Sequence, residues 1–224
     1  MPAGTITALR AQAKDPQRVN VFVNGEFAIG VSLNTISKEG LYVGKQLSAE
    51  DLARVEQAES SDKALHAALR FLEARPRSAF EIRERLRRKG FADEAIEAAI
   101  ERLTALGMID DAAFARSWVE GRQASRPRGV GALRDELRRK GIDRAVAETL
   151  LSDEALTGGE EQRAMSVARG ALAKYANAPN RAAFQRRLGA YLQRRGFGFD
   201  TIGPILETLW AEQEEQRTKS KEQT

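Results

Sequence analysis

Apolar and polar positions alternate along residues 18–31, RVNVFVNGEFAIGV. A period of two residues is typical of a half-buried β-strand. Asn24 and Gly25 interrupt the alternation, and both residue types accept the positive φ angles of a type I′ turn. The pattern therefore predicts a β-hairpin, to which the preceding segment GTITALRAQ can add a third strand.

A helix is predicted directly after this β-rich segment. Ser48 and Asp51 have the spacing of a capping box, with Asp in place of the usual Glu or Gln. The polar pair Ser60-Ser61 follows, so we expect this helix to end near Glu59. Residues 1–60 would then form a small β-rich N-terminal unit with one helix.

From Asp62 to Trp210 the period of the apolar positions changes to about 3.6 residues, which indicates helices. A basic signature ending in glycine and an apolar residue occurs three times in this region. Its glycines are spaced by 51 and 55 residues, as in tandem supersecondary units. Apolar residues recur four and eight positions before each glycine and predict one buried helical stripe: Leu86, Leu137, Leu192, Ile82, Leu133 and Leu188.

Each copy of the signature belongs to a predicted three-helix repeat. RPRS at 75–78 and RPRG at 126–129 stand at the same offset from their glycines, and their prolines cannot continue the preceding helix. A third helix is predicted in each repeat, at 95–105, 145–151 and 201–210. The predicted fold is mainly α, with tandem three-helix repeats in an elongated right-handed array after the β-hairpin-containing unit. We expect the repeats and the polar, disordered tail at 61–109, 110–156, 157–211 and 212–224.

Composition narrows the class of protein without naming its function. The 224 residues are 42% hydrophobic and 30% charged, as in a globular protein. Lys and Arg number 36 against 32 Asp and Glu, and a net charge of +4 does not identify a polyanionic partner. The chain has no cysteine, which excludes disulfides and thiolate metal sites. We find no signal peptide or membrane-spanning run, and we expect a cytoplasmic protein.

The basic signatures allow two interpretations. Cations in the last turn of a helix stabilise it by a few tenths to about 1 kcal/mol, because they face the partial negative charge of its C-terminus. Three clusters at regular intervals also suit a polymeric anion or a filament. The clusters alone slightly favour the first interpretation.

The third repeat favours a polyanion more strongly. Between Gln162 and Phe199 there are eight bases and no acid, whereas residues 62–153 hold nineteen bases and sixteen acids. A segment without acids concentrates positive potential, so we expect contact with phosphates rather than reading of bases. Most aromatic residues here have the spacing of a core, but Tyr175 and Phe199 are candidates for base stacking.

Catalytic residues are not apparent. His66 is the only histidine and lacks partners for a triad or a metal site, so we interpret it as a surface residue. Asp110 and Asp111 lie at a predicted helix start, where capping explains them better than a shared acid-base site. We predict no enzyme, no cofactor and no metal.

The segments RPRSAFEIRERLRRKGF, IERLTALGMIDDAAFARSWVEGR and RPRGVGALRDELRRKGID together resemble the RecX family of regulatory proteins, from about Asp62 to Leu151. The N-terminal hairpin resembles the family more loosely. The third repeat has the family's length and final Gly-aromatic step, but NAPNRAAF replaces the Arg-Pro-Arg turn.

This resemblance implies a non-enzymatic protein that binds the RecA recombinase filament and limits its ATPase and strand exchange in recombination, repair and the SOS response. We expect it to be a monomer. The first alternative is a stand-alone, sequence-nonspecific nucleic-acid-binding protein, and the second is an adaptor that binds some other protein. Expected contacts with the filament are Arg75, Arg77, Arg87, Arg88, Lys89, Arg126, Arg128, Arg138, Arg139 and Lys140. Expected contacts with single-stranded DNA, bound weakly, are Lys174, Arg181, Arg186, Arg187, Arg194 and Arg195.

Overall fold

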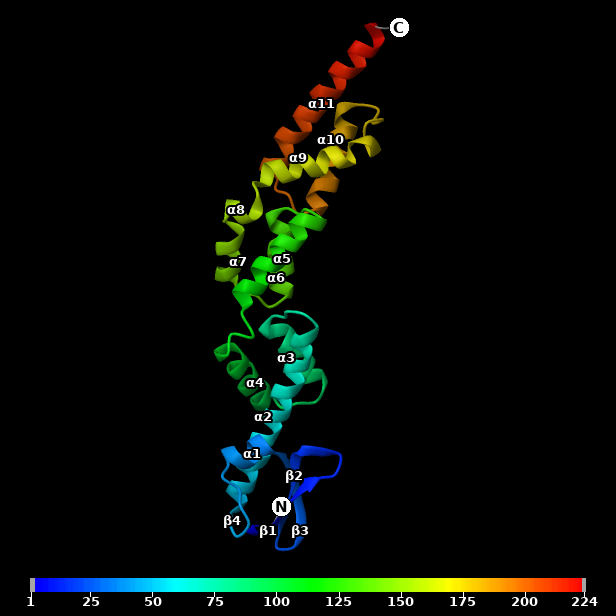
Figure 1. Cartoon of the computed structure of the whole chain (residues 1–224). Coiled ribbons are helices and arrows are strands. Elements are labelled where there is room, and N and C mark those ends of the chain that lie inside the picture. Colours follow the sequence, from blue (N-terminus) through cyan, green and yellow to red (C-terminus); the bar gives the residue numbers. More distant parts are fainter. Residues whose placement is uncertain (1–2, 223–224) are drawn as a thin grey trace. The chain divides into compact units, whose positions relative to one another are not determined.

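The computed structural model describes residues 3–222. The chain divides into two compact units, residues 1–110 and 111–224. The first contains the β-rich segment and the first repeat, and the second contains the other two repeats. Figure 1 labels the helices and strands in chain order. The predicted elongated, right-handed arrangement of the repeats stays a prediction.

The N-terminal segment forms a four-stranded antiparallel sheet in the order β3-β2-β1-β4. Asn24 and Gly25 join β2 to β3 with φ angles of 51° and 88°, as the type I′ turn requires. The hairpin and the additional strand are thus confirmed. The strands are β1 (Gly4–Gln12), β2 (Asp15–Val23), β3 (Glu26–Ser32) and β4 (Gln46–Leu47).

One face of this sheet forms a small core with two helices, α1 (Leu33–Lys38) and α2 (Ala49–Ala74). The alternating valines of β2 point to this face, as their period of two predicts. Ser48 and Asp51 form the predicted capping box at the start of α2. Other buried members of the core are Ile6, Val31, Leu41, Leu47, Leu52 and Val55.

The predicted end of α2 near Glu59 is wrong, because the helix continues through Ser60-Ser61 to Ala74. Glu59 is only 1% exposed, and its Oε2 accepts a hydrogen bond from the backbone N–H of Ser32 at 2.8 Å. Its Oε1 lies 2.8 Å from Nη2 of Arg18. The polar residues that resembled a linker therefore include a buried carboxylate that attaches the sheet to the helix. The predicted domain boundaries stay predictions.

The first repeat consists of the C-terminal half of α2 with α3 (Ala79–Arg88) and α4 (Asp93–Ala105). The Ser78 side chain accepts the N–H of Glu81 at 3.2 Å and caps α3. Gly90 follows the helix with a φ of 84°, a left-handed conformation that favours glycine. Leu86 is fully buried, which confirms the predicted stripe in this repeat.

The second repeat has the same arrangement in the second unit. Leu133 and Leu137 of its middle helix are fully buried, so the stripe is confirmed here too. They pack with Phe114 and Val119 in one core. The helices are α5 (Asp111–Ser125), α6 (Val130–Arg139) and α7 (Arg144–Leu151), followed by the short α8 (Glu154–Thr157).

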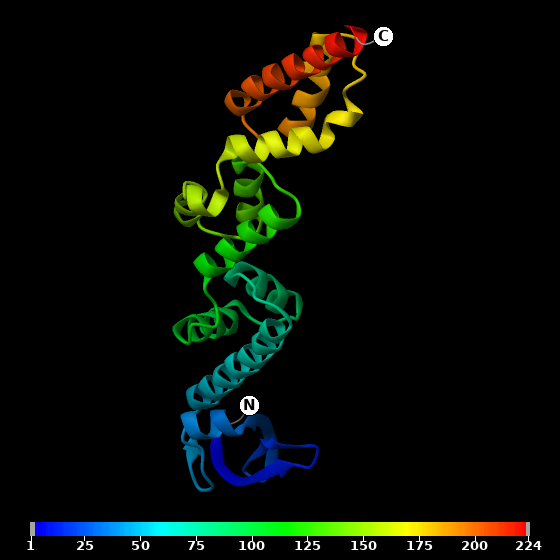
Figure 2. The ribbon, with the colours of Figure 1, turned by 45° about the horizontal axis from the view of Figure 1, so that its top comes forward.

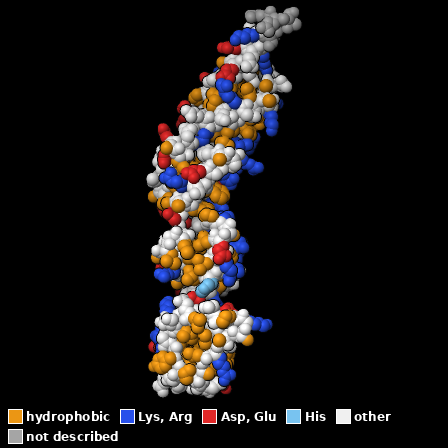
Figure 3. Space-filling view, viewed as in Figure 1, with side chains coloured by type: hydrophobic (Ala, Val, Ile, Leu, Met, Phe, Trp, Pro, Cys, Tyr) orange, Lys and Arg blue, Asp and Glu red, His pale blue; other side chains and the backbone are white. Residues whose placement is uncertain are grey.

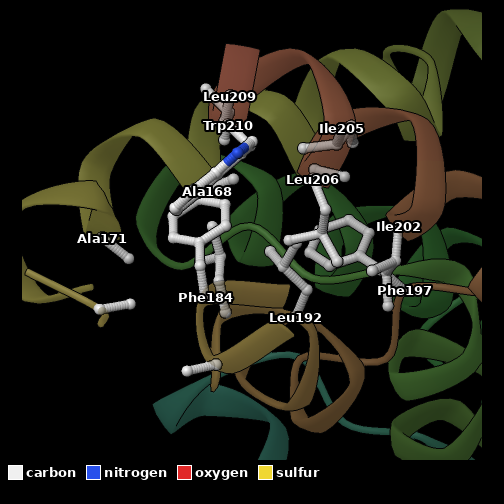
Figure 4. Close-up of a cluster of buried hydrophobic side chains, with 14 residues drawn as sticks. Ala168, Ala171, Phe184, Leu192, Phe197, Ile202, Ile205, Leu206, Leu209 and Trp210 are labelled. Atoms are coloured by element: carbon white, nitrogen blue, oxygen red, sulfur yellow. The ribbon is translucent and has the colours of Figure 1, made fainter. Parts of the chain in front are cut away.

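The third repeat surrounds the core shown in Figure 4, where Phe184, Leu192 and Trp210 point toward one another. The rings of Phe184 and Trp210 lie 5.4 Å apart between centroids. Figure 2 shows the helices of this repeat packed together, in agreement with their shared core. They are α9 (Glu160–Ala171), η1 (Leu172–Lys174), α10 (Arg181–Arg194) and α11 (Phe199–Glu222).

The prediction of a disordered tail after Trp210 is wrong for the described residues, because α11 continues to Glu222. Gln213 is buried, and Nη2 of Arg217 donates to the carbonyl of Ala176 at 2.7 Å. The Arg217 guanidinium also lies 5.6 Å from the centroid of the Trp210 ring. Polar side chains thus hold the added turns against the repeat without an apolar stripe. Residues 223–224 lie outside the described residues.

The second and third repeats join through glycine backbones. The N–H of Gly129 donates to the carbonyl of Arg195 at 3.0 Å, and the N–H of Gly131 to that of Gly196 at 3.2 Å. A Cβ atom on Gly129 would lie 2.2 Å from the Gly196 oxygen. Gly129 therefore permits a close approach of the two backbones. A serine at this position, the residue type that the first repeat has at the aligned Ser78, would block it. Among the described residues, no helix is both long and apolar enough to cross a membrane.

Candidate functional site

Most predicted filament contacts of the first repeat are already bound within that repeat. Arg75 donates to both carboxylate oxygens of Glu81, at 2.9 and 3.2 Å. Arg87 binds Glu84 at 2.8 Å and Asp93 at 2.9 Å, and these hydrogen bonds, chiefly that with Asp93, raise its pKa. These bases lie at the surface together with acids, so their charge is locally compensated.

Three further bases of the first repeat bind backbone or an aromatic ring. Nε of Arg77 donates to the carbonyl of Phe71 at 3.0 Å, and burial lowers the pKa of this guanidinium. Nε of Arg88 donates to the carbonyl of Glu84 at 3.2 Å. Lys89 lies 5.4 Å from the centroid of the Phe71 ring. The cation before the glycine thus packs on its own repeat.

In the second repeat, several bases contact one buried carboxylate, that of Glu136. Its Oε2 accepts hydrogen bonds from Nε of Arg122 at 2.7 Å and from Nε1 of Trp118 at 2.9 Å. Nε of Arg128 lies 3.1 Å from Oε1. Lys140 lies 4.5 Å from the Trp118 ring centroid. Trp118 is half-buried beside the core and also supports this polar network. Arg128 and Lys140 therefore have structural partners.

Arg126 and Arg139 are the more available bases of the second repeat. Both are exposed, and no ion pair involves either one within the described residues. Arg126 aligns with Arg75, whose partner Glu81 is replaced here by Ala132. Arg138, by contrast, has Asp135 at 3.4 Å. Among the described residues, all five of these cations in the first repeat contact a carboxylate, a carbonyl or an aromatic ring, whereas Arg126 and Arg139 of the second repeat form no such side-chain contact.

The acid-free segment of the third repeat is not wholly without acids in space, because α11 supplies them. Arg181 lies 3.1 Å from Glu207, and Arg169 lies 2.7 Å from Glu212. Arg163 is buried and donates to the carbonyl of Thr157, and burial lowers its pKa. These three bases do not contribute an uncompensated surface charge.

Four other exposed bases lie between Gln162 and Phe199: Lys174, Arg186, Arg187 and Arg194. Within the part of the chain that the structure describes, none of them forms an ion pair. Arg187 and Arg194 are seven positions apart on α10 and so share one face of the helix. We name these four residues the α10 basic surface. Arg195, also predicted to bind DNA, instead lies 5.1 Å from the Tyr191 ring centroid.

The two candidates for base stacking differ in exposure. Tyr175 is partly buried: it packs against the third-repeat core and against Tyr191, with ring centroids 5.9 Å apart. Phe199 is 74% exposed and lines a shallow groove of about 750 Å³ together with Arg194. Phe199 is therefore the more accessible of the two candidates for stacking, because Tyr175 is partly covered.

The aromatic partners of the signature cations were missed by sequence reasoning. Phe71, Trp118 and Tyr191 each lie beneath the cation that precedes a signature glycine. They occupy different aligned positions, so comparison of the repeats did not reveal them. His66 is exposed, as predicted, and Asp111 begins α5.

Four family models match the chain in order. The Regulatory protein RecX N-terminal domain matches residues 4–48, and the first, second and third RecX three-helix domains match residues 64–103, 110–151 and 159–206. The chain belongs to the RecX family. The third repeat, which lacks the Arg-Pro-Arg turn, is thus a RecX domain as well.

RecX relatives cover most of the chain. A regulatory protein RecX of Bacillus licheniformis is 30% identical over 202 residues, which are 90% of this chain and 76% of the relative. That of Mycobacterium avium is 36% identical over 171 residues, 76% of this chain and 95% of the relative. A crystal structure of a regulatory protein RecX has a TM-score of 0.76 at 24% identity, covers 92% of this chain and 100% of its own, and supports the fold.

Proposed function

We propose that this chain binds the RecA recombinase and its filament on DNA and inhibits the ATPase and strand exchange of the recombinase. Its place would be in recombination, DNA repair and the SOS response, in the cytoplasm, and it would act as a monomer without enzymatic activity. The observation that carries this proposal is the match of all four RecX domains in order.

The distribution of charge supports different binding partners for the first two repeats and for the third. The first two repeats present bases among acids, an arrangement that suits recognition of a protein surface more than bare phosphate. Arg126 and Arg139 are their most available cations. The α10 basic surface of the third repeat would contact the DNA backbone, with Phe199 as a stacking residue.

The test is the ATPase of the recombinase on single-stranded DNA, measured with increasing amounts of this chain. We expect substoichiometric amounts to lower the rate, because one bound molecule can affect many subunits of a filament. Arg126→Gln with Arg139→Gln should weaken the inhibition, and Arg75→Gln, whose base already binds Glu81, serves as the control. An unchanged ATPase at equimolar, folded protein would refute the proposal.

A second function is favoured by the exposed bases of α10, namely stand-alone binding of nucleic acid without sequence preference. A pull-down with the recombinase in the absence of DNA separates the two functions. Retention of the recombinase supports the regulatory function. Loss of all retention, together with strong binding of bare DNA, supports the alternative.

A further inference from the structure

The solvent face of the N-terminal sheet carries an exposed aromatic pair. Phe27 is 60% exposed, and its ring lies edge-to-face with that of Phe22 at 6.1 Å between centroids. The guanidinium of Arg10 lies 5.0 Å from the centroid of the Phe22 ring. The core on the opposite face includes neither ring. In Figure 3, hydrophobic side chains gather over the N-terminal unit, with basic side chains nearby.

Strand register places these residues on one surface. Phe22 pairs with Ala8 on one side and with Phe27 on the other, and the next outward row is Arg10, Asn20 and Gly30. Successive side chains of a strand point to opposite faces, so these two rows share the outer face. The three strands therefore present an aromatic row beside a polar row.

The polar row is ordered by hydrogen bonds. Nε2 of Gln12 donates to Oδ1 of Asn20 at 2.8 Å, and Nη2 of Arg18 donates to the carbonyl of Gly30 at 2.9 Å. A Cβ atom on Gly30 would lie 2.7 Å from Nε2 of Gln12. Because Gly30 has no side chain, Gln12 can extend across the sheet at this position. No side chain of residue 30 then projects beside the two rings.

We propose that this face binds single-stranded nucleic acid, with a base stacked on Phe27 and a phosphate held by Arg10. Aromatic rings on a sheet and a neighbouring cation are the groups that hold unpaired bases and their backbone. The assignment adds a function for the N-terminal sheet and does not require the recombinase.

Charge favours nucleic acid over a protein partner. Residues 4–23 contain three bases and one acid. Arg10 forms no ion pair within the described part of the chain, whereas Arg18 is held by Glu59. The one acid of this stretch, Asp15, pairs with Gln12 at the end of β1, and Glu26 begins β3 beside Phe27. Neither belongs to the row of Arg10, Asn20 and Gly30. The apolar part of the face consists of two rings bordered by hydrogen-bonding groups, less than the apolar core of a stable protein interface requires.

The test is the affinity of the full chain for fluorescein-labelled oligo(dT), measured by anisotropy at fixed salt. Lys174, Arg186, Arg187 and Arg194 are all changed to Gln in the background, so that the α10 basic surface does not mask the sheet. In this background Phe27→Ala should lower the affinity about tenfold, the loss expected from one stacked base. Phe27→Tyr should retain the affinity, because the ring is kept.

Tyr42→Ala is the matched control, since Tyr42 is 62% exposed in the same unit but lies in the loop before β4. It should bind oligo(dT) like the background protein. Arg10→Gln should reduce the slope of log affinity against log salt by about 0.7, the value for one phosphate on a single strand. Equal affinities for Phe27→Ala and Tyr42→Ala, with unchanged thermal transitions, would overturn the assignment and leave the recombinase proposal to its own ATPase test.

Discussion

The first and third repeats bury the same helical stripe but place their bases differently. In the first, Arg87 binds two carboxylates, one on its own helix and one at the start of α4. In the third, Arg187 and Arg194 form no ion pair within the described residues. The comparison indicates that the buried apolar stripe determines the fold of a repeat. Acids on neighbouring helices determine whether the bases of that repeat are available to a partner.

The largest effect should come from breaking the stripe in each of these repeats. Leu86→Asp and Leu192→Asp each bury an unpaired carboxylate at a fully buried position, which should cost about 4 kcal/mol or more. We expect the first variant to keep most DNA binding and the second to lose the part that the third repeat supplies. Thermal unfolding followed by DNA anisotropy checks both expectations.

Leu106→Asp is the control for these variants, because Leu106 is 51% exposed and should tolerate the charge. If Leu86→Asp and Leu192→Asp keep the parent's thermal transition, the stripe does not support the repeats as described. If both lose DNA binding equally, the third repeat is not the principal contact.

A smaller effect should follow from exchanging the aligned residues Ser78 and Gly129. Gly129→Ser places a side chain against the Gly196 backbone and disrupts two hydrogen bonds of the junction, at a cost of about 2 kcal/mol. Ser78→Gly loses only a cap, for which glycine substitutes at a few tenths of a kcal/mol. Urea unfolding measures both changes. Equal losses in the two variants would contradict the special role of Gly129.

The bases themselves should affect DNA binding with little effect on stability. Changing Arg186, Arg187 and Arg194 to Gln should reduce the slope of log affinity against log salt by about 2, since roughly 0.7 counterions are released per phosphate on a single strand. The matched variant changes Arg75, Arg87 and Arg138, which already have carboxylate partners. It should alter the slope less. Equal slopes for parent and α10 variant would remove the DNA assignment.

The smallest predicted effect is a loss of folding stability at acidic pH. Hydrogen bonds from Arg83 and Arg134 hold the pKa values of Glu97 and Glu148 below their ordinary value of 4.5. Each lowered pKa stabilises the folded state above 4.5, and this contribution is lost as the pH falls through the folded pKa. Both acid side chains are nearly half exposed, so solvent screens their ion pairs and the change should be small.

The measurement is the thermal transition as a function of pH for the parent and for Arg134→Gln. The variant should be slightly less stable near neutral pH and should approach the parent in acid. Arg187→Gln, which removes a base without a carboxylate partner, is the control and should shift little. A constant difference between parent and Arg134→Gln at every pH would contradict the role of Glu148.

The sequence predicted the hairpin and the helical stripe because each depends on local rules. Asn24-Gly25 fixes a turn by backbone conformation alone, and Leu86 and its aligned residues follow the helical period. The polar residues near Glu59 led to a wrong prediction of the end of α2, because the Glu59 carboxylate is buried among partners distant in sequence. The polar residues after Trp210 led to a second wrong prediction, because polar contacts hold a helix there without an apolar stripe.

The candidate site divides in the same way. The sequence by itself determined where the bases lie along the helices, because periodicity fixes which positions face solvent. Only the tertiary structure decided which bases are available, because an ion pair depends on acids brought close by folding. Glu207 reaches Arg181 from a distant helix, and Glu136 collects three partners in the second repeat. Charge in a sequence is additive, but compensation depends on distance in space.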